Sequence, residues 1–142
     1  MLLSDLQIFA EKDLKLNRND LALESLRTPE IHNVWMKYLS IEKLSLYNLE
    51  NKYNILYKKR WDFYLGNATA EEYAENPFSK KVIRGDINIY INADIEICKL
   101  LLKVKLAEEK VNFILETIKQ INGRNWHIGN AIKWKTFING EN

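Results

Sequence analysis

The sequence predicts a mainly α-helical protein with long helices, and two observations support this fold class. Only five glycines and two prolines occur in 142 residues, so few positions force a helix to end. Apolar side chains also recur at helical spacing over long segments, most clearly from Asp94 to Ile121. The length and the composition, 46% hydrophobic and 28% charged, suit one globular domain with its own core.

Two short helices are expected first. Ser4 and Gln7 have the spacing of a capping box, in which each side chain satisfies a backbone N–H at the start of a helix. This predicts a helix to about Leu14. A polar run then ends at Asp20, a favoured N-cap residue, which predicts a second short helix through Leu26.

A long helix is predicted to start at Thr28. Thr28 is a favoured N-cap residue, and Pro29 then occupies the first helical position, where its missing N–H costs nothing. The carboxylate of Glu30 interacts favourably with the positive end of the helix dipole. Since no Gly or Pro follows until Gly66, we expect one helix of about 37 residues, longer than a compact monomer of this size can cover.

The middle of the chain predicts a connector and a short β-hairpin. Residues 66–81 contain glycine, asparagine, proline and three glutamates, a composition typical of a mobile acidic connector. The next segment is rich in β-branched residues, has a Gly-Asp turn centre, and alternates at Ile87, Ile89 and Ile91. This alternation favours a short hairpin over residues 82–91.

The C-terminal part predicts a helix that is apolar on more than one side. Its main seam repeats every seven residues with interleaved positions at fours and threes, as in a coiled coil. Gly123 is expected to end this helix at the C′ position, and a short basic helix follows. The seam comprises Ile97, Leu101, Val104, Val111, Leu115 and Ile118, and a second row beside it comprises Leu100, Ala107, Ile114 and Ile121.

Two interpretations of these rows stay open. Rows wider than a simple seam favour an assembly of more than two strands, which predicts a self-assembling bundle or ring. Alternatively, the rows bury against residues 28–65 of the same chain. The chain is accordingly divided into an N-terminal helical part with the acidic connector, residues 1–81, and a hairpin and oligomerisation part, residues 82–142, within one structural unit.

Three cations precede a run of aromatic rings near the end of the predicted long helix. At about 100° per residue, Lys58 and Arg60 point to nearly opposite sides of the helix, and Lys59 lies between them. Arg60 shares its side with Phe63 and Tyr64, where cation–π contacts can hold the guanidinium while its N–H groups reach a phosphate. The segment is therefore a candidate polyanion-binding site.

Single-stranded nucleic acid is the polyanion that this combination suits. Cations contact the phosphates and aromatic faces stack with any base, which gives binding without sequence preference. Residues 34–65 and 98–142 carry an excess of cations, whereas the segments between and before them are acidic. A plainer interpretation is that the rings belong to the core and the lysines are solvated neighbours.

Other kinds of chemistry lack their signatures in this sequence. Cys98 is the only cysteine, which excludes an internal disulfide or a cysteine metal cluster and gives no sign of an oxidising compartment. His32 and His127 show no metal-ligand spacing, and none of the glycines belongs to a phosphate-binding loop. No apolar run reaches the roughly 18 residues of a membrane span. We therefore expect no metal, no cofactor and no catalytic activity.

Several short motifs also resemble a known family. Residues 58–66, KKRWDFYLG, resemble the basic-aromatic K-x-R-x-D-[YF]-Y-x-G element of the UvsY family, the recombination mediator proteins of T-even-type bacteriophages. Residues 3–7, LSDLQ, are similar to the L-x-D-L-Q opening of that family, and Trp35 occupies the place of its Trp-containing helix start. The resemblance spans nearly the whole chain and rests on the order and spacing of the motifs.

The resemblance implies a protein that binds single-stranded DNA and helps to load a RecA-like recombinase, UvsX, onto DNA coated by the phage single-strand binding protein. It implies a ring-like homo-oligomer, a hexamer or heptamer held by its C-terminal helices, in the cytoplasm of the infected bacterial host. It also implies that Lys58 and Arg60 contact the DNA backbone, with Lys59 as an additional cation and Tyr64 beside them. A coiled-coil interaction hub, or a helical regulator that binds duplex DNA, is the alternative.

Overall fold

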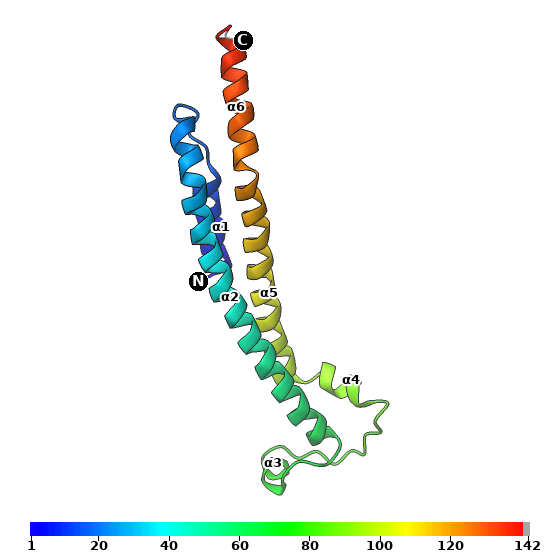
Figure 1. Ribbon diagram of the computed structural model, residues 1–142. Coiled ribbons are helices and arrows are strands. Elements are labelled where there is room, and N and C mark those ends of the chain that lie inside the picture. The colour runs from blue at the N-terminus through cyan, green and yellow to red at the C-terminus, as the bar shows by residue number, and fades with distance from the viewer. Residues whose placement is uncertain (141–142) are drawn as a thin grey trace. The chain divides into compact units, whose positions relative to one another are not determined.

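The computed structural model describes residues 1–140, and its regular elements are helices (Figure 1). The prediction of a mainly α-helical chain is confirmed. Two compact units divide the chain, one made of Met1–Lys43 with Glu108–Asn142 and the other of Leu44–Ala107. No helix within residues 1–140 is long and apolar enough to cross a membrane. The helices are α1 (Leu3–Leu14), α2 (Leu21–Tyr64), α3 (Ala70–Glu75), α4 (Ile87–Asn92), α5 (Ile95–Asn122) and α6 (Arg124–Ile138).

Helix α1 ends at Leu14, as predicted, but its cap differs from the prediction. The backbone N–H of Leu2 donates to Oδ2 of Asp5 at 2.9 Å, so the capping box expected between Ser4 and Gln7 is wrong. The buried residues of α1 are Leu6 and Ala10, which stand four positions apart and so share one face of the helix.

Helix α2 begins at Leu21 and continues through Pro29, so the separate helix start expected at Thr28 is wrong. Asp20 does cap the helix, because its Oδ1 accepts the backbone N–H of Leu23 at 3.2 Å. Inside the helix, Oγ1 of Thr28 donates to a carbonyl oxygen of the preceding turn at 3.2 Å. Since proline removes one intrahelical hydrogen bond, other interactions must stabilise this turn.

A buried arginine of α6 supplies those interactions. Arg124 is only 2% exposed; its Nε donates to Oγ1 of Thr28 at 3.1 Å. Its Nη2 donates to the carboxylate of Glu24 at 2.7 Å and to the carbonyl of the same residue at 3.1 Å. Its Nη1 donates to the carbonyl of Asp13 in α1 at 3.0 Å. Arg124 thus joins α6 to both α1 and the proline-containing turn of α2.

Trp35 lies at the centre of the unit that contains α1. Its Nε1 donates to Oδ2 of Asp13 at 3.0 Å, and its ring contacts Tyr38 edge-on with centroids 5.3 Å apart. The Trp35 and Phe113 ring centroids are 6.4 Å apart, which brings α5 into the same core. The other buried apolar residues of this unit are Leu6, Ala10, Leu21, Ile31, Leu39, Val111, Ile114, Ile118, Ile121 and Ile128.

Three isoleucines form a buried cluster in the second unit, and they show why the predicted hairpin is wrong. Ile87 and Ile91 of α4 and Ile97 of α5 are each at most 2% exposed. Residues 84–86 form a turn and residues 87–92 are helical, so no strand occurs between residues 82 and 91. Positions 87 and 91 are also one helical turn apart, and the helix buries both while leaving Ile89 68% exposed. Tyr53, Leu56, Tyr57, Trp61, Tyr64, Leu65 and Val82 pack against this cluster.

The segment 66–81 is more ordered than the predicted connector. It contains α3, which is capped by Oγ1 of Thr69 accepting the backbone N–H of Glu72 at 3.3 Å. The ring of Tyr73 stacks on Phe63 at 5.1 Å, and its hydroxyl donates to the Phe63 carbonyl at 2.7 Å. The expectation of a segment without packed elements is therefore wrong, because its aromatic side chains supply apolar contacts that its acidic composition does not show.

Helix α5 spans the range predicted for it, but Gly123 does not end it in the left-handed conformation. Because α5 ends at Asn122, the prediction that Gly123 ends the helix is confirmed, but Gly123 has φ −80 and α6 begins at the next residue, so the expected C′ conformation is wrong. The short basic helix predicted after Gly123 is confirmed as α6. The Gly123 N–H donates to the carbonyls of Lys119 and Gln120, both at 3.1 Å. These bonds connect α5 to α6 without an intervening loop.

The apolar rows of α5 are mostly buried within the single chain. Four of the six seam residues, Ile97, Val104, Val111 and Ile118, are at most 9% exposed, as are Ala107, Ile114 and Ile121 of the second row. Leu101 is half-buried, and Leu115 is 37% exposed. Burial within one chain, one of the two interpretations of these rows, therefore describes most of both rows.

Candidate nucleic-acid interface

The predicted basic segment lies in the last two turns of α2, where Arg60 is enclosed by aromatic rings. The Cζ atom of Arg60 lies 4.2 Å from the Phe63 ring centroid and 5.2 Å from that of Tyr64. These contacts confirm the cation–π arrangement expected from helical spacing. The Arg60 side chain is only 16% exposed, so its guanidinium is largely removed from solvent.

Asp94, at the start of α5, holds both Arg60 and Tyr64. Its Oδ2 accepts a hydrogen bond from Nε of Arg60 at 2.7 Å and another from the Tyr64 hydroxyl at 2.7 Å. Its Oδ1 accepts the backbone N–H of Ile97 at 3.1 Å, so the same carboxylate also caps α5. The residues that sequence analysis grouped as binding residues are thus divided, since Arg60 and Tyr64 belong to a buried network.

The network changes the pKa values of its members in directions that favour the ion pair. Burial alone would raise the pKa of Asp94, but hydrogen bonds from Tyr64, the Ile97 N–H and Arg60 outweigh burial and lower it. Burial would lower the pKa of Arg60, but its bonds to Tyr64 and Asp94 raise it. Burial and the hydrogen bond to the Asp94 carboxylate raise the pKa of Tyr64. Asp94 and Arg60 therefore stay charged and Tyr64 stays neutral at neutral pH.

Lys58 and Lys59, in contrast, extend into solvent. The Lys58 side chain is 73% exposed and its Nζ lies 2.7 Å from Oδ1 of Asp62, which is itself 36% exposed. An ion pair of this kind contributes at most about 1 kcal/mol, so a phosphate can replace the Asp62 carboxylate at little cost. Lys59 is also exposed. These two lysines are the predicted site residues that remain accessible.

Most rings near the basic segment belong to the core. Phe63 is 4% exposed, and Tyr53, Tyr57, Trp61 and Tyr64 are half-buried. The plainer interpretation is therefore confirmed for these rings. Sequence analysis missed the role of Asp94, because nothing in the local pattern connects it with Arg60. The sequence could have predicted only that Asp94 caps α5, because an aspartate directly before an apolar helix is a typical N-cap.

A cavity of about 740 Å³ opens beside the Arg60 network. Aromatic side chains from three segments, Tyr64, Phe78 and Tyr90, line it, with ring centroids between 5.2 and 5.9 Å apart. Its charged lining consists of Arg60 together with the carboxylates Asp94 and Glu96. The cavity therefore suits an apolar or planar group better than a phosphate, because the carboxylates repel an anion.

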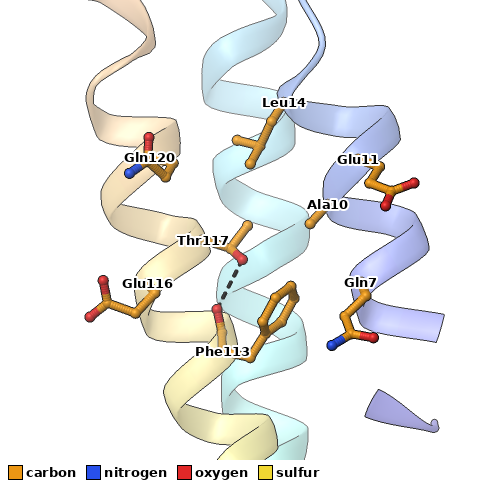
Figure 2. Close-up of a pocket in the computed structure, with 8 residues that line it drawn as sticks. All are labelled: Gln7, Ala10, Glu11, Leu14, Phe113, Glu116, Thr117 and Gln120. Atoms are coloured by element: carbon orange, nitrogen blue, oxygen red, sulfur yellow. Dashed lines mark hydrogen bonds between the residues drawn. The ribbon is translucent and has the colours of Figure 1, made fainter. Parts of the chain in front are cut away.

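A second groove, between α1 and α5, does not have the charge of a DNA-binding site (Figure 2). Its volume is about 530 Å³, and a hydrogen bond of 2.9 Å joins Oγ1 of Thr117 to the Phe113 carbonyl at its wall. The groove carries the carboxylates of Glu11 and Glu116 and no lysine or arginine. The basic end of α2 is the better candidate, since phosphates require cations.

The fold and the site define a helical protein that presents exposed lysines beside a ring-lined ion pair at the end of a long helix. Residues 9–141 match the family model described as "Recombination, repair and ssDNA binding protein UvsY". Because this match covers most of the chain, the chain belongs to the UvsY family. The family expected from the order of the sequence motifs is confirmed.

Crystal structures of the bacteriophage T4 recombination mediator protein UvsY share this fold. The Lattice Type II structure has a TM-score of 0.86 at 20% identity and covers 96% of this chain and 97% of that chain. The Lattice Type I structure has a TM-score of 0.84 at 19% identity, with coverages of 94% and 98%. The Lattice Type IV structure has a TM-score of 0.80 at 20% identity, with coverages of 96% and 98%. A comparison with curated proteins finds no match.

Proposed function

We propose that this protein is a recombination mediator that binds single-stranded DNA and promotes the loading of a UvsX-type recombinase onto DNA coated by the phage single-strand binding protein. Membership of the UvsY family supports this function. The single observation that carries the proposed site is the exposure of Lys58 and Lys59 beside a helix end that Asp94 fixes in place. The site of action would be the cytoplasm of the infected host.

The four predicted site residues receive two different roles in this proposal. Lys58 and Lys59 contact phosphates, because both are exposed and the Asp62 partner of Lys58 is easily replaced. Arg60 and Tyr64 fix the direction of the α2 end through their bonds to Asp94. Because the Arg60 side chain is only 16% exposed, it contributes little direct contact with the DNA. A rigid support reduces the entropy lost when the lysines bind.

Assembly into a ring-like homo-oligomer is the second part of the proposal. Several weak sites on one ring raise the affinity for a strand, since after one copy engages, the others bind at high effective concentration. The α5 seam is largely buried in the chain, so we assign the contacts between copies to exposed apolar residues of the C-terminal helices. These residues are Leu115, Trp126, Trp134, Phe137 and Ile138.

Fluorescence titration of oligo-dT over a range of salt concentrations tests the proposed DNA site. Lys58→Ala with Lys59→Ala is expected to weaken binding and to reduce the salt slope by about 1 for each engaged copy, since a single strand contributes about 0.7 per phosphate contact. Lys12→Ala with Lys15→Ala removes two exposed lysines, one in α1 and one directly after it, and should leave the slope unchanged. An unchanged affinity and slope in the first variant, with the oligomer intact, would refute the assignment.

Competition with duplex DNA separates the proposal from its alternatives. Preference for oligo-dT over a duplex of equal length supports single-strand binding, because stacking with bases requires that they have left a duplex. Equal or greater affinity for the duplex would instead indicate a duplex-binding regulator. Binding of neither would indicate an interaction hub. Recombinase loading is then measured as the rate of filament formation on DNA coated by the single-strand binding protein.

A further inference from the structure

Three further cations stand in the connection between α3 and α4, outside the predicted site. Lys80, Lys81 and Arg84 are all exposed, and none of them forms an ion pair within residues 1–140. We propose that they form a second phosphate-binding segment, which extends the path of single-stranded DNA beyond Lys58 and Lys59. This inference rests on the proposed single-strand binding and adds residues to that site.

The core of the second unit anchors the chain beside both basic segments. Val82 packs against the buried isoleucine cluster, and so do Tyr57 and Trp61 of α2. Lys58 directly follows Tyr57 in the chain, and Lys81 directly precedes Val82. Because Tyr57 and Val82 share one core, the lysines beside them emerge at the surface of the same unit.

Hydrogen bonds fix the position of the second segment. The hydroxyl of Tyr57 donates to Oδ1 of Asn88 at 3.2 Å, which ties the start of α4 to α2. The backbone N–H of Asp86 donates to the carbonyl of Ile83 at 3.0 Å and closes the turn that carries Arg84. A segment held at both Val82 and this turn presents its cations from a defined backbone, which lowers the entropy cost of binding.

The charges of the segment favour a phosphate chain as its ligand. Residues 79–86 contain three cations, Lys80, Lys81 and Arg84, and one exposed acid, Asp86, so the segment is net basic. In the α2 segment, the carboxylate of Asp62 is already paired with Lys58 at 2.7 Å. Arg84 adds a planar fork that can bind one phosphate through two N–H groups, whereas each lysine acts as a point charge.

Salt-dependent titration of oligo-dT with the full chain tests the inference. Lys80→Ala, Lys81→Ala and Arg84→Ala together are expected to lower the salt slope by about 2 for each engaged copy and to weaken binding at near-physiological salt by more than about tenfold. The matched control replaces Lys12, Lys15 and Lys37, three exposed lysines of the other unit, with alanine. The control should keep the wild-type slope.

The outcomes distinguish this inference from the proposed function. If wild-type protein does not bind oligo-dT, the proposed function fails and this inference fails with it. If the wild type binds, the variant at Lys58 and Lys59 loses slope, and the triple variant keeps the wild-type slope, only the second segment is refuted. A triple variant that keeps full DNA affinity but no longer binds an acidic protein in a pull-down also refutes it. Unchanged circular dichroism is expected for every variant, since all replaced side chains are exposed.

Discussion

The Nε of Arg60 donates to Oδ2 of Asp94 at 2.7 Å and joins two residues that are 34 positions apart in the chain. The Tyr64 hydroxyl donates to the same oxygen, and the other carboxylate oxygen caps α5. One side chain therefore fixes both the end of α2 and the start of α5. The direction in which Lys58 and Lys59 leave α2 depends on this contact.

Asp94→Asn is expected to lower the free energy of unfolding by about 2 to 3 kcal/mol. The substitution keeps the size of the side chain but removes the charge that balances a largely buried guanidinium, and breaking one half of a buried ion pair costs more than the pair contributes. Asp94 is only 5% exposed, so bulk solvent screens the charge of the pair poorly. Urea unfolding followed by circular dichroism measures the change.

Asp62→Asn is the matched control for that substitution. Asp62 also pairs with a cation at 2.7 Å, but this pair is exposed and should contribute less than about 1 kcal/mol. Equal losses in the two variants would show that burial of the Arg60 pair does not determine its energy. No loss in Asp94→Asn would show that the network does not stabilise the helix end.

The sequence predicts the surroundings of Arg60 only as far as local geometry reaches. Helical spacing places Arg60 beside Phe63 and Tyr64, and both ring contacts are present. The partner Asp94 belongs to another helix, and its approach to Arg60 depends on how the second unit folds. Tertiary contacts of this kind leave no periodic signal in a sequence.

The fold shows the same division between local and tertiary causes. The range of α5 follows from its apolar periodicity, which is long and regular. Ile87, Ile89 and Ile91 fit both a strand and a helix, and burial of the first and third decides for the helix. The helix-start signal at Pro29 is overruled because the buried Arg124 supports the turn around the proline. Local sequence signals therefore predicted the helices correctly only where no buried tertiary contact favoured a different structure.

Glu24→Gln is expected to flatten the acid side of the stability profile. Burial would raise the pKa of Glu24, but the hydrogen bonds from Arg124 and Arg27 outweigh burial and lower it from the usual 4.5. The ionised form is therefore favoured in the folded state, and Glu24 contributes stability above pH 4.5 that is lost as the pH falls through its lowered folded pKa. Unfolding free energies between about pH 7 and pH 3 measure the slope.

Glu116→Gln provides the comparison for the pH measurement. Glu116 pairs with Lys119 at 2.7 Å, but both side chains are more than two-thirds exposed, at 68% and 70%. This variant should keep the acid slope of the wild type. If Glu24→Gln also keeps that slope, the buried carboxylate does not stabilise the folded state through its charge.

Arg124→Lys is expected to destabilise the first unit by about 3 kcal/mol. Lysine keeps the charge but cannot form the four hydrogen bonds that the guanidinium donates to Thr28, Glu24 and Asp13. Because the chain contains four tryptophans, urea unfolding followed by circular dichroism measures the loss. Arg27→Lys is the control, because Arg27 is 34% exposed and, within residues 1–140, donates only to Glu24. Equal effects of the two substitutions would contradict the role given to the buried fork.

Trp134→Ser with Phe137→Ser is expected to dissociate the proposed oligomer while the chain stays folded. The two rings stack at 5.6 Å and are 62% and 72% exposed, so the isolated chain leaves a pair of large apolar groups in water that a neighbouring copy can cover. The control, Leu23→Ser with Leu26→Ser, changes two leucines of α2 that are 51% and 72% exposed and should keep the wild-type mass. Sedimentation at two salt concentrations measures the mass of each variant. If the α6 variant keeps the wild-type mass, the contact between copies lies elsewhere. If the wild-type protein itself sediments as a monomer, the avidity on which the proposed DNA binding depends is absent.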